Sequence, residues 1–343
     1  MTCSMPAGPD DAEMIRLYDA QGVCLDTPAT GDTALPGTVC WIDMLHPTPE
    51  EEAQVEALIG VEVPSRDELR DIEPSSRLYI ENGAVYLTAS VVWKADSEFA
   101  EIADIGFVLT GNRLVTIRYA EPKAFTMFAA SAHRELAHRE IIANAGGHDV
   151  MTRLLEAMID RSAEVLEHRS RRIDALSTEV FSRGAANNPE AVTRDLEATL
   201  GVIAGHQRTV AKVRESLMSL ARIASFLQTL PEIMGDKTLK QRCRSMAGDV
   251  QSLSEHADFI SENIIFLLDA SLGLISVQQN QVMKVLSVAA MIFLPPTFIG
   301  TVYGMNFQDM PELSQPWAYP IALTVMAVSA LGPYLWFKRK GWF

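Results

Sequence analysis

Hydrophobic and polar positions follow three successive patterns along the chain. Up to about residue 121, short apolar alternations separated by turn residues predict strands mixed with short helices. From about 122 to 280, apolar residues recur every three or four positions, as on one face of a helix. Two almost wholly apolar stretches follow. We therefore predict an α+β chain that ends in a pair of membrane-spanning helices.

The first region, residues 1–121, is predicted to be a cytoplasmic α/β domain whose sheet is built largely from hairpins. Asn82-Gly83 separates two apolar-alternating arms and has the composition of a type I′ turn. A second hairpin is predicted to turn at Gly111-Asn112.

Residues 122–235 are predicted to form a cytoplasmic helical region that contains an antiparallel pair of helices, 151–181 and 189–230. A third helix, the stalk, is predicted over 236–280. Its apolar positions alternate in steps of four and three, as in a coiled coil. These positions are Leu239, Cys243, Met246, Val250, Leu253, Ala257, Ile260, Ile264, Leu267, Ser271 and Leu274.

No proline or paired glycine separates the stalk from the first apolar stretch, so we predict one helix that continues to residue 303. Such a helix is about 100 Å long at 1.5 Å per residue. A helix of this length requires packing against the preceding helical pair or against other copies of the chain.

The two apolar stretches have the length of membrane spans. We predict a first span over 281–303, a loop over 304–316 and a second span over 317–337, followed by a basic tail over 338–343. Lys284 opens the first span and the tail is basic, whereas the loop contains no lysine or arginine. The positive-inside rule then predicts that both termini are cytoplasmic and that the loop is outside the cell membrane.

The charge of the chain is equally uneven. Residues 1–280 contain 25 basic and 42 acidic residues, a net charge of −17. A portion this acidic argues against nucleic-acid binding, which requires a basic surface. The chain also contains no phosphate-binding glycine loop, no nucleophile elbow and no metalloprotease histidine pair, so we do not expect an enzyme.

Small polar and apolar residues form a stripe along the first span. In steps of three and four it contains Asn280, Met283, Ser287, Ala290, Leu294, Thr297 and Thr301. One interpretation is a pore lining in which Met283, Leu286 and Leu294 act as dewetting gates. The other is helix packing, because small residues are common where membrane helices meet.

A pore requires several copies of the chain, because a single hairpin cannot enclose one. Asp309 and Glu312, repeated around the mouth of such a pore, would concentrate cations there. A cation is therefore favoured over an anion as the transported ion.

The residues around the first span resemble a known family. Tyr303-Gly304-Met305-Asn306, directly after this span, resembles the signature of the CorA magnesium transporters. Residues 280–286, 307–313 and 333–340 resemble the family's span entry, its loop and its ending in the enterobacterial branch. The sequence similarity is close over about 280–343. The preceding residues are similar to the family in their predicted architecture.

The resemblance implies a homopentameric, funnel-shaped channel in the inner membrane that takes up Mg²⁺, and also Co²⁺ and Ni²⁺. It implies no organic cofactor. By the same resemblance, Asn306 supplies side-chain oxygens to a hydrated ion, and Gly304 and Met305 shape its loop. The remaining roles are Thr297 in the pore lining, Met283 and Leu286 in the inner gate, and Asn280 at the cytoplasmic mouth.

In some members of the family, Mg²⁺ bound between cytoplasmic subunits closes the channel through two aspartates. Counting back from the signature without gaps, these positions fall on Ser245 and near Lys94. Asp249 and Asp96 are nearby carboxylates. We expect regulation by Mg²⁺ to be distributed over the acidic interface, with a metal site that includes Asp249 and Asp96 as a hypothesis.

Two alternatives stay open at the level of sequence. One is a zinc transporter of the related ZntB type, against which the intact loop over 307–313 argues. The other is a membrane sensor that does not conduct ions and whose stalk transmits cation occupancy.

Overall fold

The chain divides into two compact units. They are Met1–Leu176 with Gly201–Phe266, and Ser177–Leu200 with Leu267–Phe343. The computed structural model of the chain describes residues 15–19, 24–25, 35–71, 73, 77–97, 100–135, 146–183, 189–305 and 311–341.

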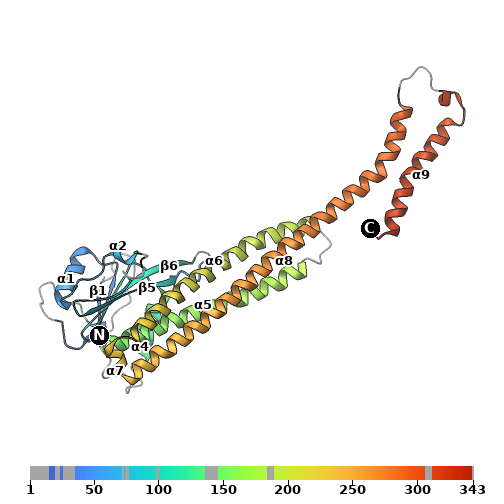
Figure 1. Cartoon of the computed structure of the whole chain (residues 1–343). Helices are drawn as coiled ribbons and strands as arrows, with labels where there is room; N and C mark the ends of the chain where they lie inside the picture. The colour runs from blue at the N-terminus through green and yellow to red at the C-terminus, as the bar shows by residue number, and fades with distance from the viewer. Residues whose placement is uncertain are drawn as a thin grey trace. The chain divides into compact units, whose positions relative to one another are not determined.

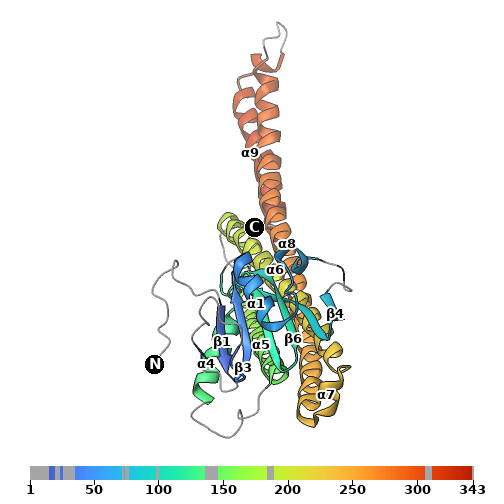
Figure 2. The same ribbon diagram turned by 90° about the vertical axis from the view of Figure 1, so that its left-hand side faces the viewer.

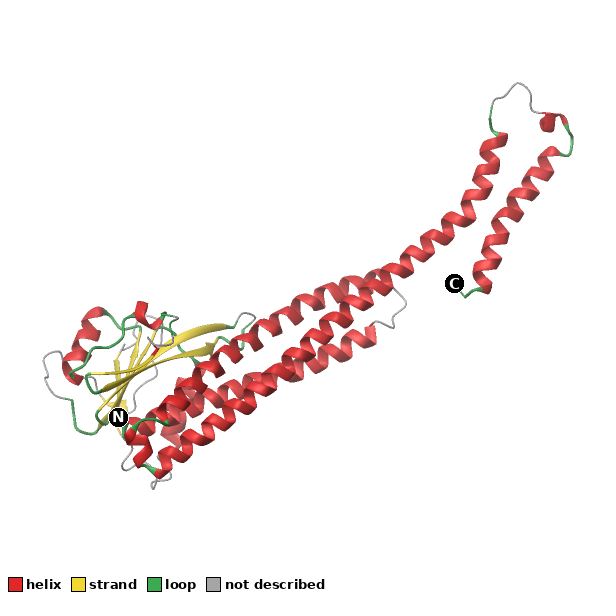
Figure 3. Ribbon diagram, in the orientation of Figure 1, coloured by secondary structure: helices red, strands yellow, loops and turns green. Residues whose placement is uncertain are grey.

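The first unit contains a seven-stranded mixed sheet (Figures 1 and 3). The strand order is β2-β1-β3-β7-β6-β5-β4. Strands β3 and β7 are parallel, and every other neighbouring pair is antiparallel. The strands are β1 (Ile15–Asp19), β2 (Cys24–Leu25), β3 (Val39–Leu45), β4 (Leu78–Glu81), β5 (Ala84–Trp93), β6 (Glu101–Thr110) and β7 (Arg113–Arg118).

Both predicted hairpins are confirmed. Strands β4 and β5 are joined at Asn82 and Gly83, whose φ angles of 49° and 78° are both positive, as a type I′ turn requires. Strands β6 and β7 are joined at Gly111 and Asn112. The parallel pairing of β3 with β7 brings together strands that are distant in sequence.

The two faces of the sheet are covered by different helices. On one face, Ile42, Met44 and Ile117 pack with Val55 of α1 (Pro49–Ile59) and Leu69 of α2 (Arg66–Leu69). Because side chains alternate along a strand, Trp41 and Asp43 point to the opposite face. There the Trp41 ring lies 6.4 Å from the ring of Phe125 in α4 (Lys123–Glu135).

A buried ion pair joins β3 to β7 on this second face. The Arg118 guanidinium donates to both oxygens of Asp43, at 2.9 and 2.8 Å, and lies 4.6 Å from the centre of the Phe125 ring. Thr116 donates to Asp43 at 2.8 Å and accepts from the indole N–H of Trp41 at 3.0 Å. Each polar group in this cluster therefore has a partner, which is the condition under which buried charge is tolerated.

Parts of three long helices pack beside the sheet in the first unit (Figure 2). They belong to α5 (Gly147–Arg183), α6 (Pro189–Leu227) and α8 (Lys237–Tyr303), with the short α7 (Pro231–Gly235) between α6 and α8. The backbone N–H of Ser90 in β5 donates to Ser219 Oγ of α6 at 3.0 Å. Buried positions of α8 in this unit follow the predicted seam: Cys243, Met246, Val250, Ala257, Ile260 and Ile264.

Helix α5 begins four residues earlier than the predicted Met151, because its start is held against the β6–β7 turn. The Gly147 N–H donates to the Asn112 carbonyl at 2.8 Å. A Cβ atom at Gly147 would lie 2.4 Å from the carbonyl carbon of Arg113, so only glycine fits.

The second unit contains the end of α5, the start of α6, the later part of α8, a short 3-10 helix η1 (Pro311–Ser314) and α9 (Ala318–Arg339). In this part of α8 the buried residues are Leu267, Ser271, Ile275, Gln278 and Val288, whereas the predicted Leu274 is half-buried. An α-helix has 3.6 residues per turn, so its buried face drifts away from a strict seven-residue repeat.

Among the residues that the structure describes, two helices, α8 and α9, are long and apolar enough to span a membrane. Only 6% of the most apolar 18-residue window of each is buried. Almost all of this apolar surface therefore needs another cover, either lipid or further helices.

We predict that Gly147→Ala lowers the free energy of unfolding of the first unit by about 1–3 kcal/mol, because the added methyl group meets backbone that cannot move aside. Urea unfolding of the detergent-purified protein, followed by tryptophan fluorescence, measures the change.

Gly248→Ala is the matched control, since Gly248 is an exposed position of α8 with open space around it. Alanine there is expected to leave stability unchanged or raise it by about 0.4–1 kcal/mol. Equal effects of the two substitutions would contradict the tight contact at Gly147.

Candidate functional site

The predicted pore and gate residues all lie on α8. Asn280, Met283, Leu286, Leu294, Thr297 and Thr301 are exposed within the described chain. At about 100° per residue they occupy roughly a third of the helix circumference. The structure therefore gathers them on one face of α8.

Three hydroxyl groups on this face share one arrangement. Ser287, Thr297 and Thr301 each donate to the carbonyl four residues earlier, at 2.8, 2.7 and 2.8 Å. Because the proton is held by the helix itself, each oxygen offers only lone pairs to its surroundings. The water shell of a hydrated cation presents hydrogens outward, so acceptors of this kind suit its passage.

Two consecutive prolines, Pro295 and Pro296, lie within the same helix. Proline has no backbone N–H, so the carbonyls of Met291 and Ile292 lose their usual partners four residues later. Freed carbonyls inside a membrane are tolerated where they meet protein or water.

The predicted selectivity loop is described only at its start. The Gly304 N–H donates to the carbonyls of Gly300 and Thr301, at 3.0 and 3.2 Å, and Met305 is exposed. Asn306 and Asp309 lie outside the described residues. Glu312 lies in η1, and its side chain is also outside the description.

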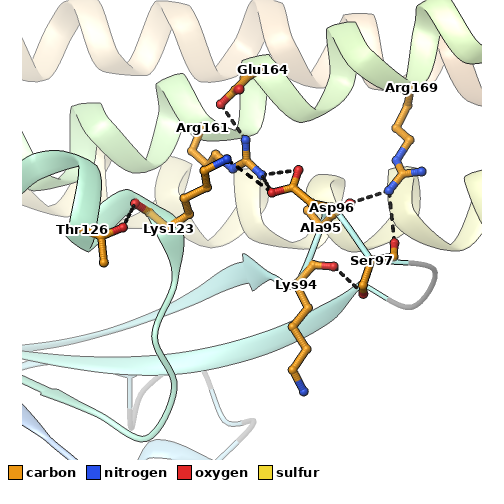
Figure 4. Close-up of polar contacts among 9 residues, drawn as sticks. All are labelled: Lys94, Ala95, Asp96, Ser97, Lys123, Thr126, Arg161, Glu164 and Arg169. Carbon is orange, nitrogen blue, oxygen red and sulfur yellow. Dashed lines mark hydrogen bonds and ion pairs between the residues drawn. The ribbon is translucent and has the colours of Figure 1, made fainter. Parts of the chain in front are cut away.

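Asp96, one of the two proposed regulatory ligands, lies in the turn between β5 and β6 and is held by basic side chains (Figure 4). Arg161 of α5 donates to both Asp96 oxygens at 2.7 Å, and Lys123 Nζ lies 3.4 Å away. The Arg161 hydrogen bonds lower the pKa of Asp96 below its usual range. These contacts neutralise the carboxylate and disfavour Asp96 as a metal ligand.

A second arginine of α5 holds the backbone of the same turn (Figure 4). Arg169 Nη2 donates to the carbonyl of Ala95 and, at 3.5 Å, to that of Ser97. Sequence reasoning missed both arginines. The sequence does carry one signal for Arg161. This residue falls among the apolar positions of an amphipathic helix, and a charge on a buried helix face requires a partner.

Asp249, the other proposed ligand, is exposed on α8. Burial raises the pKa of Asp160 on α5, and the charge of Asp249 adds to this effect. Among the described residues, no group of three or more histidine, cysteine, aspartate or glutamate side chains could hold a metal ion. The hypothesis of a regulatory site on Asp96 and Asp249 thus stays a prediction that a single chain does not test.

We predict that Asp96→Asn lowers the stability of the first unit by about 0.5–1 kcal/mol at pH 7, since the Asp96 carboxylate is largely exposed to solvent. The pKa of Asp96 is lowered by folding, so its contribution is present at neutral pH and is lost as pH falls through the folded-state pKa. Urea unfolding at a series of pH values measures both effects.

Asp258→Asn is the comparison, because its partner Arg214 is 51% exposed, whereas Arg161, the partner of Asp96, is only 6% exposed. A smaller loss of stability is expected for Asp258→Asn than for Asp96→Asn. A pH-independent difference between Asp96→Asn and the wild type would contradict the ionic contact.

Comparison with known proteins gives relatives along almost the whole chain. A magnesium transport protein CorA from Pasteurella multocida is 31% identical over 333 residues, covering 97% of this chain and 98% of the relative. A magnesium transport protein CorA from Haemophilus influenzae is 30% identical over 305 residues, with coverage of 89% and 92%.

Solved structures show the same fold. The complete structure of the CorA magnesium transporter from Methanocaldococcus jannaschii matches with a TM-score of 0.76 at 19% identity, covering 97% of this chain and 99% of that one. The full-length CmaX protein matches with a TM-score of 0.66 at 17% identity, with coverage of 95% and 96%. The α+β fold with a long helix and a C-terminal membrane hairpin is thus confirmed.

The family model described as CorA-like Mg2+ transporter protein matches residues 36–339. The match includes strands β3 to β7, the long helices and both apolar helices. It also agrees with the expectation of a transporter rather than an enzyme. The chain belongs to the family of CorA-like Mg2+ transporter proteins.

Proposed function

We propose that this protein takes up Mg²⁺ across the inner membrane as a homopentamer, with both termini in the cytoplasm. Co²⁺ and Ni²⁺ are expected to pass by the same route. Family membership carries the proposal, together with a membrane helix whose exposed face combines acceptor oxygens with apolar residues.

The need for several copies follows from the apolar helices. Since little of α8 and α9 is buried in one chain, other copies and lipid must cover them. Exposed apolar residues also continue along α8 toward its start, at Phe259, Phe266 and Leu272. An exposed apolar face of this length is typical of an interface between subunits. The number five comes from the family resemblance.

Ion recognition is assigned to the loop that contains Gly304, Met305 and Asn306. Mg²⁺ gives up its water reluctantly, so a ring of neutral amide oxygens can bind the hydrated ion without stripping it. A ring of carboxylates in the same place would hold the ion more tightly and slow its release. Asp309 and Glu312 are therefore assigned an electrostatic role at the outer mouth.

The gate is assigned to the apolar residues of the α8 face. Met283, Leu286 and Leu294 share this face with Thr297 and Thr301, and all five are exposed in one chain. A narrow ring of such side chains excludes water and thereby stops ions, which makes it a dewetting gate. Asn280 lies at the cytoplasmic end of the same face.

Control by cytoplasmic Mg²⁺ is assigned to the acidic surface as a whole. The net charge of −17 over residues 1–280 attracts divalent cations. Of the two proposed ligands, Asp249 is the better suited, because Asp96 is already neutralised by Arg161 and Lys123.

We predict that purified protein in liposomes takes up Mg²⁺ down an imposed gradient, reported by an enclosed fluorescent indicator. Asn306→Ala is expected to reduce the rate by at least about tenfold, because it removes the amide oxygen that meets the ion. Gln308→Ala, an amide in the same loop, is the matched control and should retain uptake.

If wild-type protein moves no Mg²⁺ and Asn306→Ala behaves identically, the transport proposal is wrong. A membrane sensor that does not conduct ions would then be the better explanation of the long helix.

We predict that Met283→Ser raises Mg²⁺ uptake several-fold at high cytoplasmic Mg²⁺, because a hydroxyl group rewets the constriction. The same liposome assay, with Mg²⁺ on both sides and an isotope tracer, measures the change. Val285→Ser is the control, since Val285 points away from this face at helical spacing. Equal rates for the two variants would exclude Met283 from the gate.

A further inference from the structure

In the second unit, α9 packs against the end of α8 through one side only. The less exposed residues of α9 recur every three or four positions and include Ala322, Met326, Ser329, Pro333 and Phe337. A Cβ atom at Gly300 of α8 would lie 3.4 Å from Met326 Cε, so this side of α9 faces α8. Phe337 is the most deeply buried of the set.

The side of α8 that meets α9 is opposite the face that carries the predicted pore residues. The less exposed residues at the end of α8 are Val288, Ile292, Pro295, Pro296, Ile299 and Gly300. At about 100° per residue they centre on the side opposite Met283 and Leu294. In the proposed channel α9 is therefore the outer helix, and its far side faces lipid.

The last residues of α9 carry positive charge to that far side. Lys338 and Arg339 follow Phe337 and lie about 100° and 200° around the helix from it. Both side chains are exposed, as is the next residue, Lys340. Lys338, Arg339 and Lys340 together form the basic end of α9.

An aromatic ring sets the depth of these charges. Lys340 Nζ lies 4.6 Å from the centre of the Trp336 ring, and Trp336 is 52% exposed. Exposed tryptophan rings at the end of a membrane span are typical of the boundary between hydrocarbon and lipid headgroups. The ammonium group above the ring is thereby placed at the level of the headgroups.

The membrane hairpin has no carboxylate at this level to balance the basic end of α9. Residues 270–308 and 313–343 contain no aspartate or glutamate. Because α9 returns antiparallel to α8 and Met326 meets Gly300, the basic end lies near the level of Lys284. Asp269, the last carboxylate of α8, lies about 22 Å from Lys284 along the helix.

We propose that the basic end of α9 binds the headgroup of an anionic phospholipid of the phosphatidylglycerol class. The inference rests on the proposed function for the place of α9 outside the pore. The phosphate of such a lipid lies at the depth of these side chains, and its negative charge complements theirs. A zwitterionic phospholipid has the same phosphate, but its own ammonium group offsets the charge, so weaker binding is expected.

The test is native mass spectrometry of the full-length protein in detergent, titrated with phosphatidylglycerol. The double variant, Lys338→Gln with Arg339→Gln, is expected to weaken phosphatidylglycerol binding at least about tenfold, because each basic residue near an anionic headgroup contributes about fivefold. Arg339→Lys keeps the charge and should bind within about twofold of the wild type.

Lys237→Gln with Lys240→Gln is the matched control, since it removes two exposed charges from the start of α8, in the first unit. This control should bind phosphatidylglycerol as the wild type does. Equal weakening in the two double variants would overturn the proposal, as would phosphatidylcholine binding as tightly as phosphatidylglycerol.

Two other outcomes would assign the basic end of α9 a different partner and reject the lipid. One is displacement of phosphatidylglycerol by millimolar inorganic phosphate, which would indicate a site for soluble anions. The other is loss of the oligomer in the Lys338→Gln, Arg339→Gln variant with phosphatidylglycerol binding unchanged, which would indicate carboxylates of a neighbouring copy.

Liposome uptake by the wild type is measured separately. Absence of Mg²⁺ uptake together with charge-dependent phosphatidylglycerol binding would reject the transport function and support the lipid site. Normal uptake with phosphatidylglycerol binding insensitive to Lys338 and Arg339 would reject the lipid site alone.

Discussion

The absence of water from the core of a bilayer is the constraint on which the structure depends. Backbone polar groups there must find partners within the protein, and a helix supplies them within its own segment. Helix α8 meets this requirement without interruption from Lys237 to Tyr303, except where Pro295 and Pro296 remove two donors. The same helix therefore serves both as a stalk in water and as a span in lipid.

Arginine side chains hold the elements of the acidic first unit together. Arg118 joins β7 to β3 through Asp43, Arg161 joins α5 to the β5–β6 turn, and Arg242 joins α8 to α5 through Asp149 at 2.8 Å. Each of these contacts connects residues that are distant in sequence. Residues 1–280 contain 25 basic and 42 acidic residues, so a basic side chain there that lacks an acidic partner is unusual.

Much of this architecture could be predicted from the sequence because local signals decide it. Asn82-Gly83 requires positive φ angles, and the seam from Cys243 to Ile264 requires one buried helix face, so the turn and the stalk were predictable. The parallel pairing of β3 with β7 and the early start of α5 were not, because both depend on contacts between distant segments. The roles of the loop residues came from family resemblance, since a short polar segment has no periodicity to interpret.

Arg161 has a second acidic partner, Glu164, at 2.6 Å on its own helix. If the residue at position 96 loses its charge, this buried guanidinium still has a carboxylate beside it. The turn between β5 and β6 can therefore change in sequence without leaving a charge stranded inside the protein. Relatives in which position 96 is not acidic are expected to keep an acidic residue at the position of Glu164, one turn along α5.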